Sequence, residues 1–122
     1  MFPIKKFIRS FGFAANGIYQ LIRCEQNARV HLLATVTVVI AGCLFGLNRH
    51  EWIAVCGAIG IVWAAEAINT AIEKLTDIVS PEKNPKAGLV KDIAAGAVLI
   101  CAVTAVIIAA LVFVPHIKTL SL

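Results

Sequence analysis

The stretch IAAGAVLICAVTAVIIAALVFVP, residues 93–115, decides the fold class of this 122-residue chain. No charged side chain interrupts its 23 residues. A helix of about 20 apolar residues is long enough to cross a hydrocarbon core of about 30 Å. The stretch therefore predicts a transmembrane helix.

The composition extends this prediction to the whole chain. Hydrophobic residues make up 60% and charged residues 15% of the sequence, and the mean hydropathy is +0.89. Soluble domains contain about 45–50% apolar and about 25% charged residues. The length allows one domain, so we expect a single membrane domain over residues 1–122. The net charge of +4 does not indicate a nucleic-acid partner, because the basic residues do not lie on a polar surface interleaved with aromatic residues.

Two further uncharged stretches, residues 32–48 and 52–65, lie before residues 93–115 in the sequence. The stretch 32–48 is long enough to span the membrane if its helix begins a few residues earlier. The stretch 52–65 is long enough only if its helix also carries acidic residues into the membrane. We expect three transmembrane helices, at about residues 29–48, 52–79 and 91–114.

The N-terminal segment, about residues 3–25, interleaves apolar with basic residues at broadly helical spacing. This pattern predicts an amphipathic helix on the inner leaflet, with basic side chains near anionic headgroups. A packing helix with a solvated basic face is the alternative. The expected fold class is an all-α membrane protein with three transmembrane helices plus an N-terminal amphipathic surface helix.

The basic residues predict the topology. Nine of the eleven lie before the first span or between the second and third, and only Arg49 and Lys118 lie on the other side. The positive-inside rule then places the N-terminus in the cytoplasm and the C-terminus outside. We expect a multi-pass protein of the bacterial inner membrane.

Polar residues on the second span indicate chemistry. At about 100° per residue, five side chains of EAINTAIEKLTD share a stripe about 100° wide: Glu66, Asn69, Thr70, Glu73 and Asp77. A single charge at mid-bilayer costs about 2.5–3.5 kcal/mol, so this stripe should face protein, water or a metal ion.

Depth separates the expected roles along this stripe. Glu66 would lie about 9 Å below the cytoplasmic surface, where a carboxylate suits general-base work. Glu73 and Asp77 lie nearer to water and suit a hard cation such as Mg²⁺. Three further charged residues should reach the same interface: Glu25, Lys91 and Asp92. Acidic residues with a lysine are the recurring chemistry of Mg-nucleotide handling.

Most of these residues also have an ordinary structural interpretation. Glu73 fits a helix end, and Lys91 fits a solvated anchor. Asp92 fits the favourable charge at a helix N-terminus, and Glu25 fits an i, i+4 ion pair with Arg29. Glu66 is the hardest to explain structurally. The four cysteines and three histidines show no metal-ligand spacing.

These residues resemble the small integral-membrane diacylglycerol kinase and undecaprenol kinase family of bacteria, over about residues 8–114. Four segments carry the resemblance: EQNARVHL (25–32), EWIAV (51–55), EAINTAIEKLTD (66–77) and KDIAAGAVLI (91–100). The E-x-N-x-x-x-H form of the first segment is more similar to the Gram-positive-type undecaprenol kinase branch. The proteobacterial diacylglycerol kinase branch has an acidic residue where this chain has His31.

The resemblance implies a reaction and an assembly. The family transfers the γ-phosphate of ATP to a lipid hydroxyl at the inner membrane face, and it works as a homotrimer with active sites between neighbouring subunits. Glu66 matches the general base, and Glu25 and Glu73 match the Mg²⁺ ligands. Four residues match the lining of the nucleotide site, with Lys91 on the phosphates: Asn69, Asp77, Lys91 and Asp92. This chain departs from some members at Phe13 and Lys6, which leaves the ATP contacts of the N-terminal helix open.

Two other function classes compete with a lipid kinase. A small proton-coupled transporter would use Glu66 as its intramembrane carboxylate, but it would need polar groups towards both faces. A membrane scaffold would not need Glu66. For a kinase, undecaprenol and diacylglycerol both present a primary hydroxyl at the interface, and the branch-like features modestly favour undecaprenol.

Overall fold

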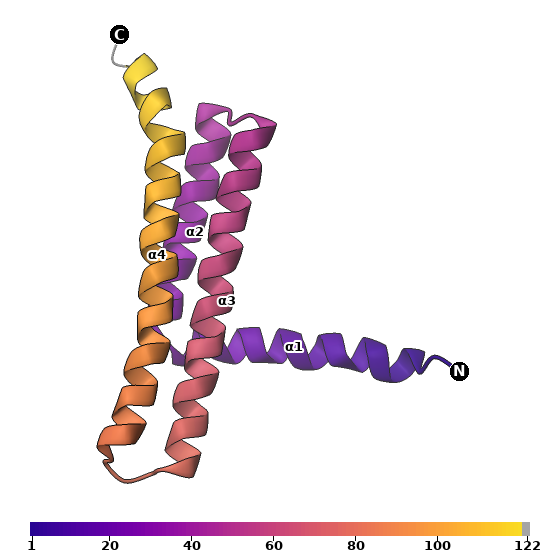
Figure 1. Cartoon of the computed structure of the whole chain (residues 1–122). Helices are drawn as coiled ribbons and strands as arrows, with labels where there is room; N and C mark the ends of the chain where they lie inside the picture. The colour runs from indigo at the N-terminus through magenta and orange to yellow at the C-terminus, as the bar shows by residue number, and fades with distance from the viewer. Residues whose placement is uncertain (121–122) are drawn as a thin grey trace.

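The computed structural model describes residues 1–120, and within them it contains four helices and no strand. The helices are α1 (Ile4–Cys24), α2 (Gln26–Phe45), α3 (Arg49–Val79) and α4 (Pro85–Leu120). In Figure 1, α2, α3 and α4 run side by side as a bundle, and α1 extends away across their direction. The last three helices are each long and apolar enough to cross a membrane. The predicted fold class is confirmed.

Helix α1 is amphipathic and largely unpacked within the chain, since Leu21 is its one buried residue. Exposed phenylalanines of α1 and of the residues just before it contact one another, with ring centroids 5.5 Å apart for Phe2 and Phe7 and 5.1 Å apart for Phe7 and Phe11. Such an apolar face on a helix that also carries basic residues is typical of a helix at a membrane surface.

The break between α1 and α2 falls at Glu25, whose backbone is extended (φ −107°, ψ 121°). The Arg29 guanidinium donates hydrogen bonds to the backbone carbonyls of Ile22 (3.2 Å) and Arg23 (2.6 Å). These bonds satisfy carbonyls that the end of α1 leaves without helical partners. Arg29 therefore fixes the joint between the surface helix and the first span.

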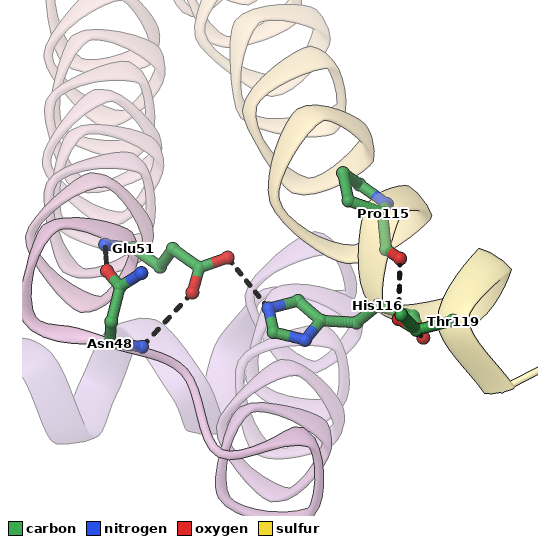
Figure 2. A network of polar contacts seen from close by, with 5 residues as sticks. All are labelled: Asn48, Glu51, Pro115, His116 and Thr119. Carbon is green, nitrogen blue, oxygen red and sulfur yellow. Dashed lines mark hydrogen bonds and ion pairs between the residues drawn. The ribbon is translucent and has the colours of Figure 1, made fainter.

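The turn between α2 and α3 is closed by local hydrogen bonds. Gly46 ends α2 in the left-handed conformation (φ 67°, ψ 56°), which glycine adopts without a Cβ penalty. Asn48 and Glu51 then form a capping box: Asn48 Oδ1 accepts from the Glu51 N–H (2.9 Å), and Glu51 Oε1 accepts from the Asn48 N–H (3.1 Å). Figure 2 shows both bonds.

Helix α4 begins at Pro85, several residues before the expected start of the third span near Lys91. Proline suits the first helical position, because its missing N–H has no partner there in any case. Asn84 supports this start, since its Oδ1 accepts from the Lys86 N–H (2.9 Å). Lys91 therefore sits inside α4, where its side chain can reach back towards α3.

The buried interior is small and lies near the α2–α3 turn, around Leu47, Val55 and Val112. Helices α3 and α4 make the most extensive contact between elements. Many large apolar side chains of the spans are exposed, among them Ile100 and Leu111. A chain with so much exposed apolar surface belongs in lipid or against other subunits.

Candidate active site

Glu66 is the central residue of the candidate site. It faces the interior of the bundle from α3 and is only 1% exposed. Its Oε2 atom makes no hydrogen bond, and neither do the buried Asn69 Oδ1 and Thr70 Oγ1. An unsatisfied buried polar group costs about 1–3 kcal/mol. Three such atoms on one face of one helix are unusual and mark this face as a candidate site.

The stripe on α3 runs from the buried interior to solvent. Glu66, Asn69 and Thr70 are buried, Glu73 is half-buried and Asp77 is exposed. Glu73 Oε1 accepts a hydrogen bond from Asn69 Nδ2 at 3.4 Å. The helix therefore presents polar groups continuously from the depth of the bundle to its end.

Lys91 on α4 connects to this stripe through Asp77. Its Nζ donates a hydrogen bond to Asp77 Oδ1, and both side chains are partly exposed. An exposed pair of this kind contributes little to stability. The pair borders a pocket of about 420 Å³ under the α3–α4 loop, to which Lys83 also contributes. Two ammonium groups, of Lys83 and Lys91, and two carboxylates, of Asp77 and Glu82, therefore line this pocket.

Glu25 and Asp92 are the two remaining carboxylates of the predicted site. Glu25 is half-buried at the α1–α2 joint and Asp92 is exposed on α4. Arg29 binds the end of α1 rather than Glu25. Within residues 1–120, no hydrogen bond or ion pair connects either carboxylate to the stripe on α3, and no three His, Cys, Asp or Glu side chains gather as a metal-binding group.

Sequence reasoning missed the surroundings of Glu66 on α2. His31 Nε2 lies 3.4 Å from Glu66 Oε2, and Trp63 Nε1 donates to Thr35 Oγ1 at 2.9 Å. The histidines looked dispersed, and spacing gave no signal for this contact because the two residues lie on different helices. The E-x-N-x-x-x-H segment had singled out His31, but as a mark of the family branch and not as a neighbour of Glu66.

The fold and the site together define a class of protein: a small integral-membrane enzyme of three spanning helices, with a deep carboxylate and a polar cluster at one end. The family model for prokaryotic diacylglycerol kinase matches residues 12–113. The chain belongs to the prokaryotic diacylglycerol kinase family. It is therefore a bacterial membrane protein and a lipid kinase that uses ATP.

Individual relatives agree with this membership. The chain is 38% identical to an undecaprenol kinase from Bacillus subtilis (strain 168) over 112 residues, which cover 92% of this chain and 91% of that protein. It is 31% identical to a diacylglycerol kinase from Synechocystis sp., over 91% of this chain and 64% of that protein. A diacylglycerol kinase from Escherichia coli (strain K12) is 26% identical over 84% of each chain. The transporter and scaffold alternatives gain no support.

Proposed function

We propose that this protein transfers the γ-phosphate of ATP to the hydroxyl of undecaprenol, with diacylglycerol as the alternative acceptor. The observation that carries the proposal is the buried Glu66 carboxylate with its unsatisfied oxygen. Undecaprenol stands first because the relative with that name is 38% identical and the two named diacylglycerol kinases are 31% and 26% identical.

The reaction needs a place that both substrates reach. A lipid hydroxyl stays near the interface, and ATP stays in water. Glu66 orients the hydroxyl and accepts its proton, the lipid oxygen forms a bond to the γ-phosphorus, and the bond from that phosphorus to the β–γ bridging oxygen breaks to release ADP. A positioned general base contributes about 10²- to 10⁴-fold to such a rate.

The Mg²⁺ that accompanies ATP would be held by Glu25 and Glu73. Mg²⁺ commonly binds one or two carboxylates and completes its shell with phosphate oxygens and water. Glu73 fits this donor set, because it is half-buried and Asn69 steadies one of its oxygens. When bound, the ion neutralises charge on the phosphates. Two protein carboxylates are enough to hold Mg²⁺ bound to ATP, so this role does not require a cluster of three or more acidic side chains.

The nucleotide would lie along the outer part of the stripe. We assign its binding to Asn69, Asp77, Lys91 and Asp92, with Glu25 and Glu73 reaching it through the metal. Lys91 has a partner in Asp77 and borders a pocket of about 420 Å³. The ammonium group would exchange this carboxylate for phosphate oxygens when ATP binds, because both are anionic acceptors.

The proposed assembly is a homotrimer in the inner membrane, with the N-terminus in the cytoplasm and the C-terminus outside. Unsatisfied polar atoms on α3 support sites completed by a neighbouring subunit. Residues 1–122 would form one kinase domain. The excess of basic residues beside the polar end of the bundle supports the orientation.

A competition assay tests the proposed acceptor. The purified full-length protein in lipid micelles receives radiolabelled ATP, Mg²⁺ and equal mole fractions of undecaprenol and diacylglycerol. We expect the label mainly in undecaprenyl phosphate. Label mainly in phosphatidic acid would reverse the order of the two acceptors, and label in neither lipid would overturn the proposal.

A further inference from the structure

Where α2 faces α3 at the level of Glu66, two residues of each helix form a group of mutual contacts. His31 and Thr35 come from α2, and Trp63 and Glu66 come from α3. Outside this group, the polar contacts of Glu66, Asn69 and Glu73 stay within α3. The group therefore connects the proposed base to a second helix.

The backbone and the ring of His31 each have a neighbour in this group. Thr35 Oγ1 donates a hydrogen bond to the His31 carbonyl (2.7 Å) and accepts one from Trp63 Nε1 (2.9 Å). The Trp63 indole in turn meets the His31 ring edge-on, with centroids 6.4 Å apart and an interplanar angle of 64°. Trp63 thus contacts the His31 ring directly, and the hydrogen bond to Thr35 holds the Trp63 indole in place.

The His31 ring places one nitrogen beside the Glu66 carboxylate. His31 Nε2 lies 3.4 Å from Glu66 Oε2, and this is the oxygen that makes no hydrogen bond. The separation is longer than a good N–H···O hydrogen bond, whose usual range is about 2.7–3.2 Å. A shift of a few tenths of an ångström would close it, and apo sites often show such loose contacts between catalytic groups.

His31 also lines an apolar cavity of about 260 Å³ between α2, α3 and α4, together with Thr35 and Trp63. Glu66 does not line this cavity. The imidazole thus stands between the buried carboxylate and a space walled by hydrocarbon side chains.

We propose that His31 is a positioning residue for this kinase. Its imidazole packs against Trp63, which Thr35 anchors, and orients the Glu66 carboxylate towards the lipid hydroxyl. The inference rests on the proposed role of Glu66 as the base. Positioning of this kind affects the chemical step, because a misplacement of about 1 Å can cost about 10²-fold in rate. ATP binding does not depend on it, because the proposed nucleotide contacts lie further along α3 and on α4.

The test compares three substitutions of His31 in the full-length protein in lipid micelles. His31→Gln keeps a nitrogen donor near the Nε2 position, whereas His31→Asn and His31→Leu do not. We expect kcat for lipid phosphorylation to fall about 10- to 100-fold in the Leu and Asn variants and to stay within about threefold in the Gln variant. The KM for ATP should stay within about twofold in all three.

His116→Leu is the matched control, because His116 makes the other histidine–glutamate contact of the chain, with Glu51, on the first turn of α3. Its kcat should stay within about twofold of the unsubstituted protein. A double variant with Glu66→Gln tests whether His31 acts through Glu66. If it does, His31→Leu lowers the residual rate of Glu66→Gln no further.

Two results would overturn the proposal: an unchanged kcat in His31→Leu, or a Gln variant as slow as the Leu variant with an equal loss of thermal stability. The second result would assign His31 to packing alone. Either result counts against the proposal only if the unsubstituted protein phosphorylates lipid in the same assay. A protein inactive on every lipid offered would instead refute the proposed function, so the two failures are distinguishable.

Discussion

Glu51 and His116 lie 2.8 Å apart, from Oε2 to Nε2, and connect the first turn of α3 to the far end of α4 (Figure 2). Glu51 uses its other oxygen to cap α3 through the Asn48 N–H. One carboxylate therefore serves both a helix start and a contact between helices. The His116 ring also contacts Phe45, with centroids 5.9 Å apart, so α2 joins the same end of the bundle.

The double role predicts unequal losses of stability. Glu51→Ala removes the cap and the helix contact, whereas His116→Ala removes only the contact. We expect Tm in micelles to fall in both variants and to fall further in Glu51→Ala. Because the two residues touch, the double variant should lose less than the sum of the single losses. Additive losses, or a larger loss in His116→Ala, would contradict this.

Glu66→Gln should reduce phosphotransfer to a small residual rate. The amide keeps the shape of the carboxylate but cannot accept the proton, so we expect kcat to fall by about 10²- to 10⁴-fold. ATP binding should largely survive, because the proposed nucleotide contacts lie nearer the end of α3. Transfer of radiolabel to lipid in micelles measures the first effect and equilibrium binding the second. Glu51→Gln, on the first turn of α3, is the control, and full turnover in Glu66→Gln would refute the base assignment.

Glu73→Ala should raise the Mg²⁺ concentration that gives half-maximal activity. Loss of a residue that only supports a ligand costs about 10- to 100-fold in metal affinity, so loss of a ligand should cost at least about tenfold. The same titration on Glu51→Gln should match the unsubstituted protein. An unchanged Mg²⁺ dependence in Glu73→Ala would assign Glu73 to helix structure instead.

Lys91→Met should raise the KM for ATP with little effect on stability. The lysine contacts Asp77 in a partly exposed pair, and such pairs contribute about 0–1 kcal/mol. Its proposed phosphate contact is charge-assisted and therefore stronger. We expect KM for ATP to rise about tenfold while Tm barely changes. Lys86→Met, another exposed lysine of α4, should leave KM unchanged, and equal effects of both lysines would indicate a diffuse electrostatic role.

Sequence patterns predicted the fold class because the length of a hydrophobic stretch depends little on tertiary detail. They also predicted the shared face of Glu66, Asn69 and Glu73, which follows from helix geometry alone. The contact of His31 with Glu66 was not predictable, since it depends on how α2 and α3 are rotated against each other. The contact of Lys91 with Asp77 was not predicted either. It depends on α4 starting at Pro85, and the roles of Asn84 and Pro85 in that helix start became clear only in the structure.

Gly42 on α2 predicts a packing test that is independent of catalysis. A Cβ at this position would lie 2.6 Å from Cη2 of Trp52, well inside van der Waals contact, whereas a Cβ at Gly57 would meet nothing within 4 Å. Overpacking of this kind costs about 1–3 kcal/mol. Gly42→Ala should therefore lower Tm, and Gly57→Ala should not. Trp52→Phe removes one of the two indole rings. In the double variant with Trp52→Phe, Gly42→Ala should therefore lower Tm by less than it does in the unsubstituted protein. No recovery in that double variant would show that the Trp52 ring is not what makes Gly42 necessary.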